Sequence, residues 1–142
     1  MSGLVGRCLC GGVTVTVDGA HVPAVGACHC AMCRRWGDGI YVDFRAEAAA
    51  VSVEGPLRRF ASSAFAERAF CDTCGSHLWF RKTGDADAPY LLMPGLFEAA
   101  RSWPLKDEGY SDRAPAYARL AGNHPRTTRA AFEARSEHVE GD

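Results

Sequence analysis

The pattern of apolar and polar positions in the first two thirds of the chain predicts short β-strands joined by turns. Residues 13–17 alternate valine with threonine and are followed by Asp18-Gly19, a turn signal, so this segment is the clearest strand. Similar short runs, most of them bounded by Gly, Pro or Asp, lie at residues 25–28, 40–44, 51–53, 57–61, 66–70, 77–81 and 90–93. The pattern therefore predicts a mainly β fold of short antiparallel strands.

Helical patterns are confined to short pieces of the chain. They occur in the turn after Cys33, at residues 96–101 and at residues 130–135. From about residue 123 onward the chain is polar and carries no strand pattern. We therefore expect one domain over residues 3–122 and a polar, loosely attached C-terminal tail over residues 123–142.

Seven cysteines, each within three residues of another, are the main chemical feature of the sequence. They occur as Cys8-x-Cys10, Cys28-x-Cys30-x-x-Cys33 and Cys71-x-x-Cys74. A disulfide framework would favour an even number of cysteines spread between loops, whereas close pairs aim two thiolates at one cation. Seven ligands are one too few for two tetrahedral zinc sites. We therefore expect one closed site and one site with an open position.

The composition and charge of the chain argue against several classes of function. With 16 basic and 17 acidic residues the net charge is −1, so nucleic acid is not expected as a partner. No apolar run approaches the roughly 18 residues of a membrane-spanning helix, and residues 1–10 contain no basic region followed by an apolar stretch and a cleavage site, so neither a membrane span nor a secretion signal is expected. Clustered reduced thiols are typical of the cytoplasm, which is the expected location.

The spacing of the cysteines favours one division between the two sites. Cys71-Asp72-Thr73-Cys74-Gly75 has the form of a zinc knuckle, which supplies two ligands. Cys8-Leu9-Cys10 supplies two more if the following Gly11-Gly12 lets the chain fold round the ion. The economical division is a closed, structural zinc on Cys8, Cys10, Cys71 and Cys74, and an open zinc on Cys28, Cys30 and Cys33.

Three segments together resemble a known family. They are Gly6-Arg7-Cys8-Leu9-Cys10-Gly11-Gly12-Val13, Cys28-His29-Cys30-Ala31-Met32-Cys33-Arg34-Arg35 and Phe70-Cys71-Asp72-Thr73-Cys74-Gly75-Ser76. In this order and at these separations they resemble the glutathione-dependent formaldehyde-activating enzymes and the related centromere protein V domain. The resemblance implies a β-tent fold with two zinc ions per chain, bound by the same two sets of cysteines. It also implies carbon–sulfur lyase activity on S-hydroxymethylglutathione, the adduct of glutathione and formaldehyde.

An open site with three thiolates also suits a thiol substrate on chemical grounds. A fourth sulfur would complete the zinc shell and become a thiolate, the form that attacks a carbonyl carbon. The partner would then be a small-molecule thiol such as glutathione. In the alternative, a fourth ligand from His29, His77 or an aspartate closes the site. The chain would then be a non-catalytic zinc-binding module for protein or nucleic-acid interaction.

Four residues near the open site are further candidates. Arg34 and Arg35 would neutralise the thiolates or pair with a substrate carboxylate, or else form a solvated face. Trp36 would line the substrate pocket or pack in the core. His29, between two ligands, is expected to point away from the metal and to act as a proton shuttle or a structural group.

Overall fold

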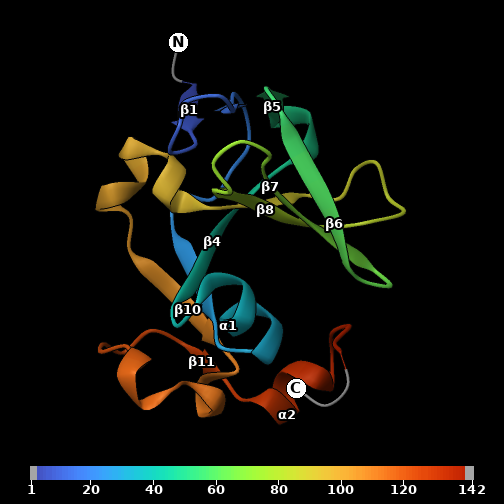
Figure 1. Cartoon of the computed structure of the whole chain (residues 1–142). Coiled ribbons are helices and arrows are strands. Elements are labelled where there is room, and N and C mark those ends of the chain that lie inside the picture. The colour runs from blue at the N-terminus through green and yellow to red at the C-terminus, as the bar shows by residue number, and fades with distance from the viewer. Residues whose placement is uncertain (1–2, 140–142) are drawn as a thin grey trace. The chain divides into compact units, whose positions relative to one another are not determined.

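The computed structural model describes residues 3–139 of the chain, and its contacts divide it into two compact units (Figure 1). Unit 1 comprises the residues up to 23 together with 43–103. Unit 2 comprises residues 24–42 together with those from 104 onward. Each unit is therefore assembled from two stretches of chain that are distant in sequence.

Unit 1 contains two antiparallel sheets. Strand β2 lies between β1 and β5 in the first sheet, and the second has the order β4-β9-β8-β7-β6. The strands are β1 (Leu4–Arg7), β2 (Thr14–Val17), β4 (Tyr41–Ala46, of which residues from 43 belong to this unit), β5 (Val51–Glu54), β6 (Leu57–Ser63), β7 (Ala66–Cys71), β8 (His77–Lys82) and β9 (Tyr90–Leu92). The 3₁₀ helices are η1 (Ala48–Ala50), η2 (Pro94–Leu96) and η3 (Glu98–Ser102).

The core of unit 1 is mainly apolar, although it also buries the charged side chain of Arg68. Val13, Val15 and Val17 are each at most 1% exposed, so the alternation seen in the sequence places one face of β2 inward. The Phe44 ring packs edge-on against Phe97, with a centroid distance of 5.2 Å. Burial of these side chains is the main favourable contribution to the stability of this unit.

Unit 2 is built differently. Strand β10 (Leu105–Gly109) lies between β3 (Val25–Cys28) and β11 (Arg126–Thr127), and both pairings are parallel. The helices are α1 (Ala31–Gly37), α2 (Arg129–Glu133), η4 (Ser111–Arg113) and η5 (Ala116–Ala118). The interior includes two polar side chains, His29 and Glu108, which are only 2% and 3% exposed.

The structure confirms the prediction of a mainly β fold, with 11 strands within residues 3–139. The parallel sheet of unit 2 differs from the expected antiparallel pairing. Parallel strands need long crossover connections. Residues 110–125, which include η4 and η5, provide such a connection between β10 and β11.

Each strand predicted from the pattern is present within a few residues, but β1, β10 and β11 were not predicted. Strand β1 contains Gly6, where a Cβ atom would lie only 2.7 Å from the Phe97 ring, so close packing requires a residue with weak strand propensity. Strand β10 is rich in charged residues and buries Glu108, which removes the apolar signal on which strand prediction depends.

The expectation of a loosely attached tail was wrong for the residues from 124 to 133. Arg126–Thr127 pairs with β10, and the Phe132 ring lies 5.0 Å from that of Tyr110. The Thr128 hydroxyl caps α2 by accepting a hydrogen bond from the backbone N–H of Ala131 at 3.2 Å. The domain boundary between residues 122 and 123 stays a prediction. No helix within residues 3–139 is long and apolar enough to cross a membrane.

The Gly55 position yields a stability prediction for unit 1. Its φ of +116° is unfavourable for any residue with a side chain, and a Cβ atom there would lie 2.1 Å from the Gly12 carbonyl oxygen. We expect Gly55→Ala to reduce the free energy of unfolding by more than the ~1–3 kcal/mol of backbone strain alone. Denaturant titration of the metal-loaded protein would measure the loss.

The control is Gly95→Ala, because a Cβ atom at Gly95 meets nothing within 4 Å and needs no positive φ. Equal stability of the two variants would show that the close approach of Gly12 and Gly55 contributes little.

Candidate metal centres and the adjoining pocket

Four cysteines from two turns of unit 1 come together as predicted. The Sγ atoms of Cys8, Cys10, Cys71 and Cys74 all lie within 4.8 Å of one another. The Cys8 and Cys10 sulfurs are 3.6 Å apart, and those of Cys10 and Cys71 are 3.8 Å apart. The first pair lies between β1 and β2, and the second lies at the end of β7 and in the turn to β8.

Each turn has a glycine with positive φ just after its cysteines. Gly11 has a φ of 79° and donates its N–H to the Cys8 carbonyl, while Gly75 has a φ of 78° and donates to the Cys71 carbonyl. A Cβ atom at either glycine would meet nothing within 4 Å, so the requirement is the backbone conformation rather than space. These turns hold the paired thiols on the same side of the chain.

Hydrogen-bond donors around this group lower the pKa of Cys8 and Cys74, whereas the pKa of Cys10 is raised to about 11 because the hydrogen bond from the Gly12 N–H is outweighed by the neighbouring thiols and burial. The backbone N–H of Val13 lies 3.2 Å from Cys8 Sγ, and that of Gly12 lies 3.4 Å from Cys10 Sγ. The Ser76 hydroxyl lies 3.2 Å from Cys74 Sγ, and this hydrogen bond is the main reason why the pKa of Cys74 is lowered to about 5. Such a donor set fits a closed site that binds a soft divalent cation.

Three cysteines of unit 2 form the second group, again as predicted. The Sγ atoms of Cys28, Cys30 and Cys33 lie within 4.8 Å of one another, at the end of β3 and the start of α1. Cys30 is the N-cap of α1, and its sulfur accepts a hydrogen bond from the Cys33 N–H at 3.3 Å. Among residues 3–139, no histidine or carboxylate joins this group as a fourth ligand.

The pKa of Cys28 is raised well above its ordinary value. The main cause is its hydrogen bond with the Cys30 thiol, followed by that with Cys33 and by burial. Without a cation, ionisation of this thiol would place a charge beside two other sulfurs. A bound divalent ion reverses this effect and deprotonates coordinating thiols. The three cysteines therefore fit a metal ion with an open position.

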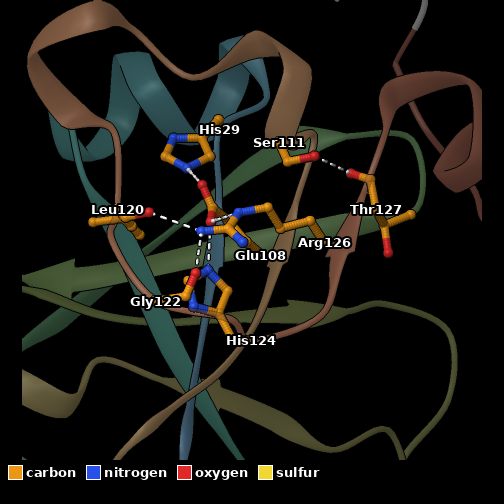
Figure 2. A network of polar contacts seen from close by, with 8 residues as sticks. All are labelled: His29, Glu108, Ser111, Leu120, Gly122, His124, Arg126 and Thr127. Atoms are coloured by element: carbon orange, nitrogen blue, oxygen red, sulfur yellow. Dashed lines mark hydrogen bonds and ion pairs between the residues drawn. The ribbon is translucent and has the colours of Figure 1, made fainter.

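The His29 side chain is directed at Glu108 in the interior of unit 2 (Figure 2). Its Nε2 lies 2.6 Å from Glu108 Oε2, and its side chain is fully buried. The other carboxylate oxygen of Glu108 contacts His124 Nε2 at 2.6 Å and Arg126 Nε at 3.3 Å (Figure 2). Burial alone raises the pKa of Glu108, but hydrogen bonds from the two histidines and the charge of Arg126 lower it below its ordinary value.

Unit 2 also contains a pocket of about 210 Å³, which is lined in part by residues close in sequence to the three cysteines but not by the cysteines themselves. Its lining residues are His29, Ala31, Arg34, Asp112, Arg113 and Ala114. Of the residues predicted to bind substrate, Arg34 is in this lining, whereas the exposed Arg35 and the half-buried Trp36 are not. The substrate roles of Arg34, Arg35 and Trp36 stay predictions.

Sequence reasoning missed several residues of this region. Asp112 and Arg113 follow β10 and reach the pocket through η4. A charged pair just after a strand could have suggested them. Glu108, His124 and Arg126 carry no sequence signal, because their grouping depends on the parallel pairing of β10 with β11.

Comparison with known proteins shows to which family the chain belongs. The sequence model of the glutathione-dependent formaldehyde-activating enzymes matches residues 3–113. The chain belongs to this family. Among curated family relatives, an uncharacterized lyase of Schizosaccharomyces pombe is 34% identical over 94 residues, which is 66% of this chain and 67% of that protein. A crystal structure of a Rhodobacter sphaeroides protein matches with a TM-score of 0.55 at 22% identity, covering 72% of this chain and 99% of that one, and shows the same fold.

The four-cysteine group leads to a prediction about stability. We expect Cys8→Ser or Cys74→Ser to lower the zinc content by one equivalent and to abolish cooperative unfolding. Structural zinc binds with about 10–16 kcal/mol in small zinc peptides, which is comparable with the whole stability of a domain. Elemental analysis and thermal denaturation would measure the two effects. Wild-type melting behaviour in either variant would contradict this assignment of the cysteines.

The three-cysteine group should behave differently. Its ligands span six residues of one turn, so they cross-link only a short loop. We expect Cys30→Ser to remove one zinc equivalent while leaving a cooperative unfolding transition. Elemental analysis would check this against Cys8→Ser, which serves as the matched variant in the other group. A single zinc in the fully reduced wild type would rule out two sites.

Proposed function

We propose that the chain is a zinc-dependent carbon–sulfur lyase that acts on the hydroxymethyl adduct of a small thiol such as glutathione. The observation that carries the proposal is the group of Cys28, Cys30 and Cys33, which has three sulfurs and no fourth ligand among the described residues. A closed site would need a fourth donor, and His29 is instead held by Glu108. The pocket lined by His29, Ala31 and Arg34, which are close to these cysteines in the sequence, has polar walls and is where we propose that the polar substituents of the substrate bind.

The comparisons support this proposal at the level of the reaction class. The family description names glutathione and formaldehyde, and the relative in Schizosaccharomyces pombe is named a lyase. Zinc is the metal that best matches sites made only of thiolates. We propose two zinc ions per chain: a structural ion on Cys8, Cys10, Cys71 and Cys74, and a catalytic ion on Cys28, Cys30 and Cys33. The reduced thiols that this requires are consistent with a cytoplasmic location.

When bound, zinc would supply a Lewis acid that stabilises the substrate sulfur as a thiolate. In the lyase direction the carbon–sulfur bond of the hydroxymethyl thiol breaks and its electron pair stays on sulfur. The hydroxyl oxygen forms a carbonyl and releases its proton, so the products are a thiol and formaldehyde. His29 is the residue proposed to take the hydroxyl hydrogen; its Nδ1 has no hydrogen-bond partner in the described structure, and because the side chain is fully buried this role would require the ring to become accessible when substrate binds.

Arg34 and Arg113 suit a substrate that carries a carboxylate. Both line the pocket, and a guanidinium pairs well with a carboxylate through two parallel hydrogen bonds. Asp112 lines the same pocket, and one of its oxygens accepts a hydrogen bond from the Arg129 backbone N–H at 2.8 Å. An acidic group beside two basic ones would favour a zwitterionic ligand over a simple anion.

The test of the activity is exchange NMR of formaldehyde with glutathione, with and without the enzyme, because the adduct also forms spontaneously. We expect accelerated exchange in the wild type and none in Cys30→Ser. A second measurement replaces zinc with cobalt and records visible spectra during titration with glutathione. S-methylglutathione, which cannot become a thiolate, should change the spectrum far less. No acceleration and no spectral change would favour the binding-module interpretation.

The pocket gives a matched pair of variants for the substrate. We expect Arg34→Ala to raise the KM for glutathione about tenfold or more, because hydrogen bonds to charged groups contribute about 1.5–3 kcal/mol. Arg35→Ala should have little effect, since Arg35 is exposed and lies outside the pocket lining. Neither variant should weaken the binding of a small neutral thiol. Equal effects of the two substitutions would show that this pocket does not hold the carboxylate.

A further inference from the structure

Tyr110 has an unusual backbone conformation just before the part of the chain that lines the pocket of unit 2. It stands between β10 and η4, and its φ of 52° and ψ of 41° lie in the left-handed region. A bulky residue rarely adopts this conformation, because its Cβ atom then crowds the backbone. The conformation directs the chain from β10 into η4, where Asp112 and Arg113 line the pocket. The placement of these two side chains therefore depends on the conformation of Tyr110.

Two contacts from α2 stabilise Tyr110 in this conformation. Its hydroxyl donates a hydrogen bond to Glu133 Oε2 at 3.0 Å, and its ring lies 5.0 Å from that of Phe132. The residue is only 2% exposed. A strained backbone conformation persists only where the surrounding contacts over-determine it. Burial of the ring and the hydrogen bond of its hydroxyl together offset the cost of the left-handed conformation.

The next two residues, Ser111 and Asp112, are bound to the same C-terminal segment. The Ser111 hydroxyl donates to the Thr127 carbonyl oxygen at 3.3 Å (Figure 2), and Asp112 Oδ1 accepts from the Arg129 backbone N–H at 2.8 Å. With the preceding tyrosine, three consecutive residues therefore form hydrogen bonds with the segment from 127 to 133. These contacts join the turn that leads into the pocket lining to β11 and α2.

We propose that Glu133 is a positioning residue that keeps Tyr110 in the left-handed conformation and thereby places Asp112 and Arg113 to bind the charged groups of the thiol substrate. The inference rests on the proposed function, because that function supplies the substrate for the pocket. Glu133 is not part of the pocket lining and acts only through Tyr110. It lies beyond residue 113, where the match to the family sequence model ends. The support of this pocket therefore comes from outside the matched region.

Substitutions at the two ends of the Tyr110–Glu133 hydrogen bond test the proposal. Tyr110→Phe keeps the ring that packs on Phe132 and removes only the hydroxyl. Glu133→Met keeps an unbranched side chain of similar length but removes the acceptor, including its 3.2 Å contact with Arg129 Nε. Glu133→Gln is the conservative variant, because its amide oxygen can still accept a hydrogen bond from the tyrosine hydroxyl. Formaldehyde exchange is measured with glutathione and with 2-mercaptoethanol, a thiol that has no charged group.

The expected result is a specific loss of glutathione binding. Tyr110→Phe and Glu133→Met should each raise the KM for glutathione about three- to tenfold, the net contribution of one hydrogen bond. The kcat should change little, because the three-cysteine group is untouched. The KM for 2-mercaptoethanol should stay the same, since this thiol offers nothing for Asp112 and Arg113 to bind. Glu133→Gln should keep the wild-type KM for glutathione. The double variant Tyr110→Phe, Glu133→Met should be no worse than either single variant, because both remove the same contact.

Amide hydrogen exchange in the zinc-loaded full-length protein gives a measurement that does not depend on activity. The Arg113 N–H donates to the Tyr110 carbonyl oxygen at 2.9 Å, and the Arg129 N–H donates to Asp112. Both amides should exchange about three- to tenfold faster in Tyr110→Phe and in Glu133→Met than in the wild type. Saturation of the wild type with glutathione should slow their exchange, whereas 2-mercaptoethanol should not.

Tyr90→Phe is the matched control. The Tyr90 hydroxyl accepts a hydrogen bond from Arg81 Nη1 at 3.2 Å in unit 1, so this substitution also removes one contact between a tyrosine and a charged residue. Tyr90 has no positive φ and does not line the pocket of unit 2. We expect this variant to keep the wild-type KM for glutathione and the wild-type amide exchange of Arg113, whatever its stability.

Three results would overturn the proposal. The first is a wild-type KM for glutathione in folded Tyr110→Phe and Glu133→Met proteins. The second is an equal rise of KM for both thiols, which would show a general disturbance of the protein. The third requires no variant to fold: it is an active wild type in which glutathione leaves the exchange of the Arg113 and Arg129 amides unchanged.

Failure of the proposed function would be recognised separately. If the wild type accelerates formaldehyde exchange with neither thiol, the lyase function fails, and amide exchange alone decides the inference. Faster exchange at Arg113 and Arg129 in Tyr110→Phe and Glu133→Met, with wild-type rates in Glu133→Gln, would then still show that Glu133 positions the pocket lining. Unchanged rates in all three variants would overturn that role as well.

Discussion

Repulsion between neighbouring thiolates is the constraint to which the rest of this structure responds. The sulfurs in each group lie within 4.8 Å of one another. Two unit charges at about 4 Å repel by about 4 kcal/mol even at an effective dielectric constant of 20. Without a metal ion the pKa of Cys28 is raised, mainly by its hydrogen bonds with the Cys30 and Cys33 thiols and then by burial and the charges of those sulfurs, so this thiol retains its proton. A divalent cation would remove this need, because it stabilises coordinating thiols in their deprotonated form.

The two units balance polar and apolar burial differently. Unit 1 buries valines, aromatic rings and leucines, so its stability has an ordinary hydrophobic source in addition to its four-cysteine site. Unit 2 has few large apolar side chains in its interior and buries the His29–Glu108 pair. A buried carboxylate is tolerated only when both of its oxygens are hydrogen-bonded, and the segment from 120 to 126 completes that requirement. The interior of unit 2 therefore contains an ordered polar cluster in place of large apolar side chains.

The sequence alone was sufficient to predict those features of the structure whose physical cause acts between residues close together in the chain. The valine–threonine alternation of β2 and the spacing of the cysteine pairs act over a few residues, so both the mainly β fold and the grouping of the sulfurs could be predicted. Strand β10 could not, because its buried residue is charged and its pairing is parallel to strands far away in the sequence. Arg34 and Arg35 look equivalent in the sequence. Only the path of α1 shows that the first lines the pocket and the second is exposed.

The hydrogen bond from the Leu9 N–H to the Ser76 hydroxyl, 3.0 Å long, joins residues 67 positions apart and has a consequence for synthesis on the ribosome. Cys10 leaves the ribosome well before Cys71, its neighbour in the folded site 61 positions later. At about 5–20 residues per second, this interval lasts several seconds. During it the first two thiols have neither their partner sulfurs nor the Ser76 contact, while the three cysteines of the second group are completed well before it ends, when Cys33 is synthesised. During translation the three-cysteine group should therefore bind its metal ion first, although the four-cysteine group begins earlier in the sequence.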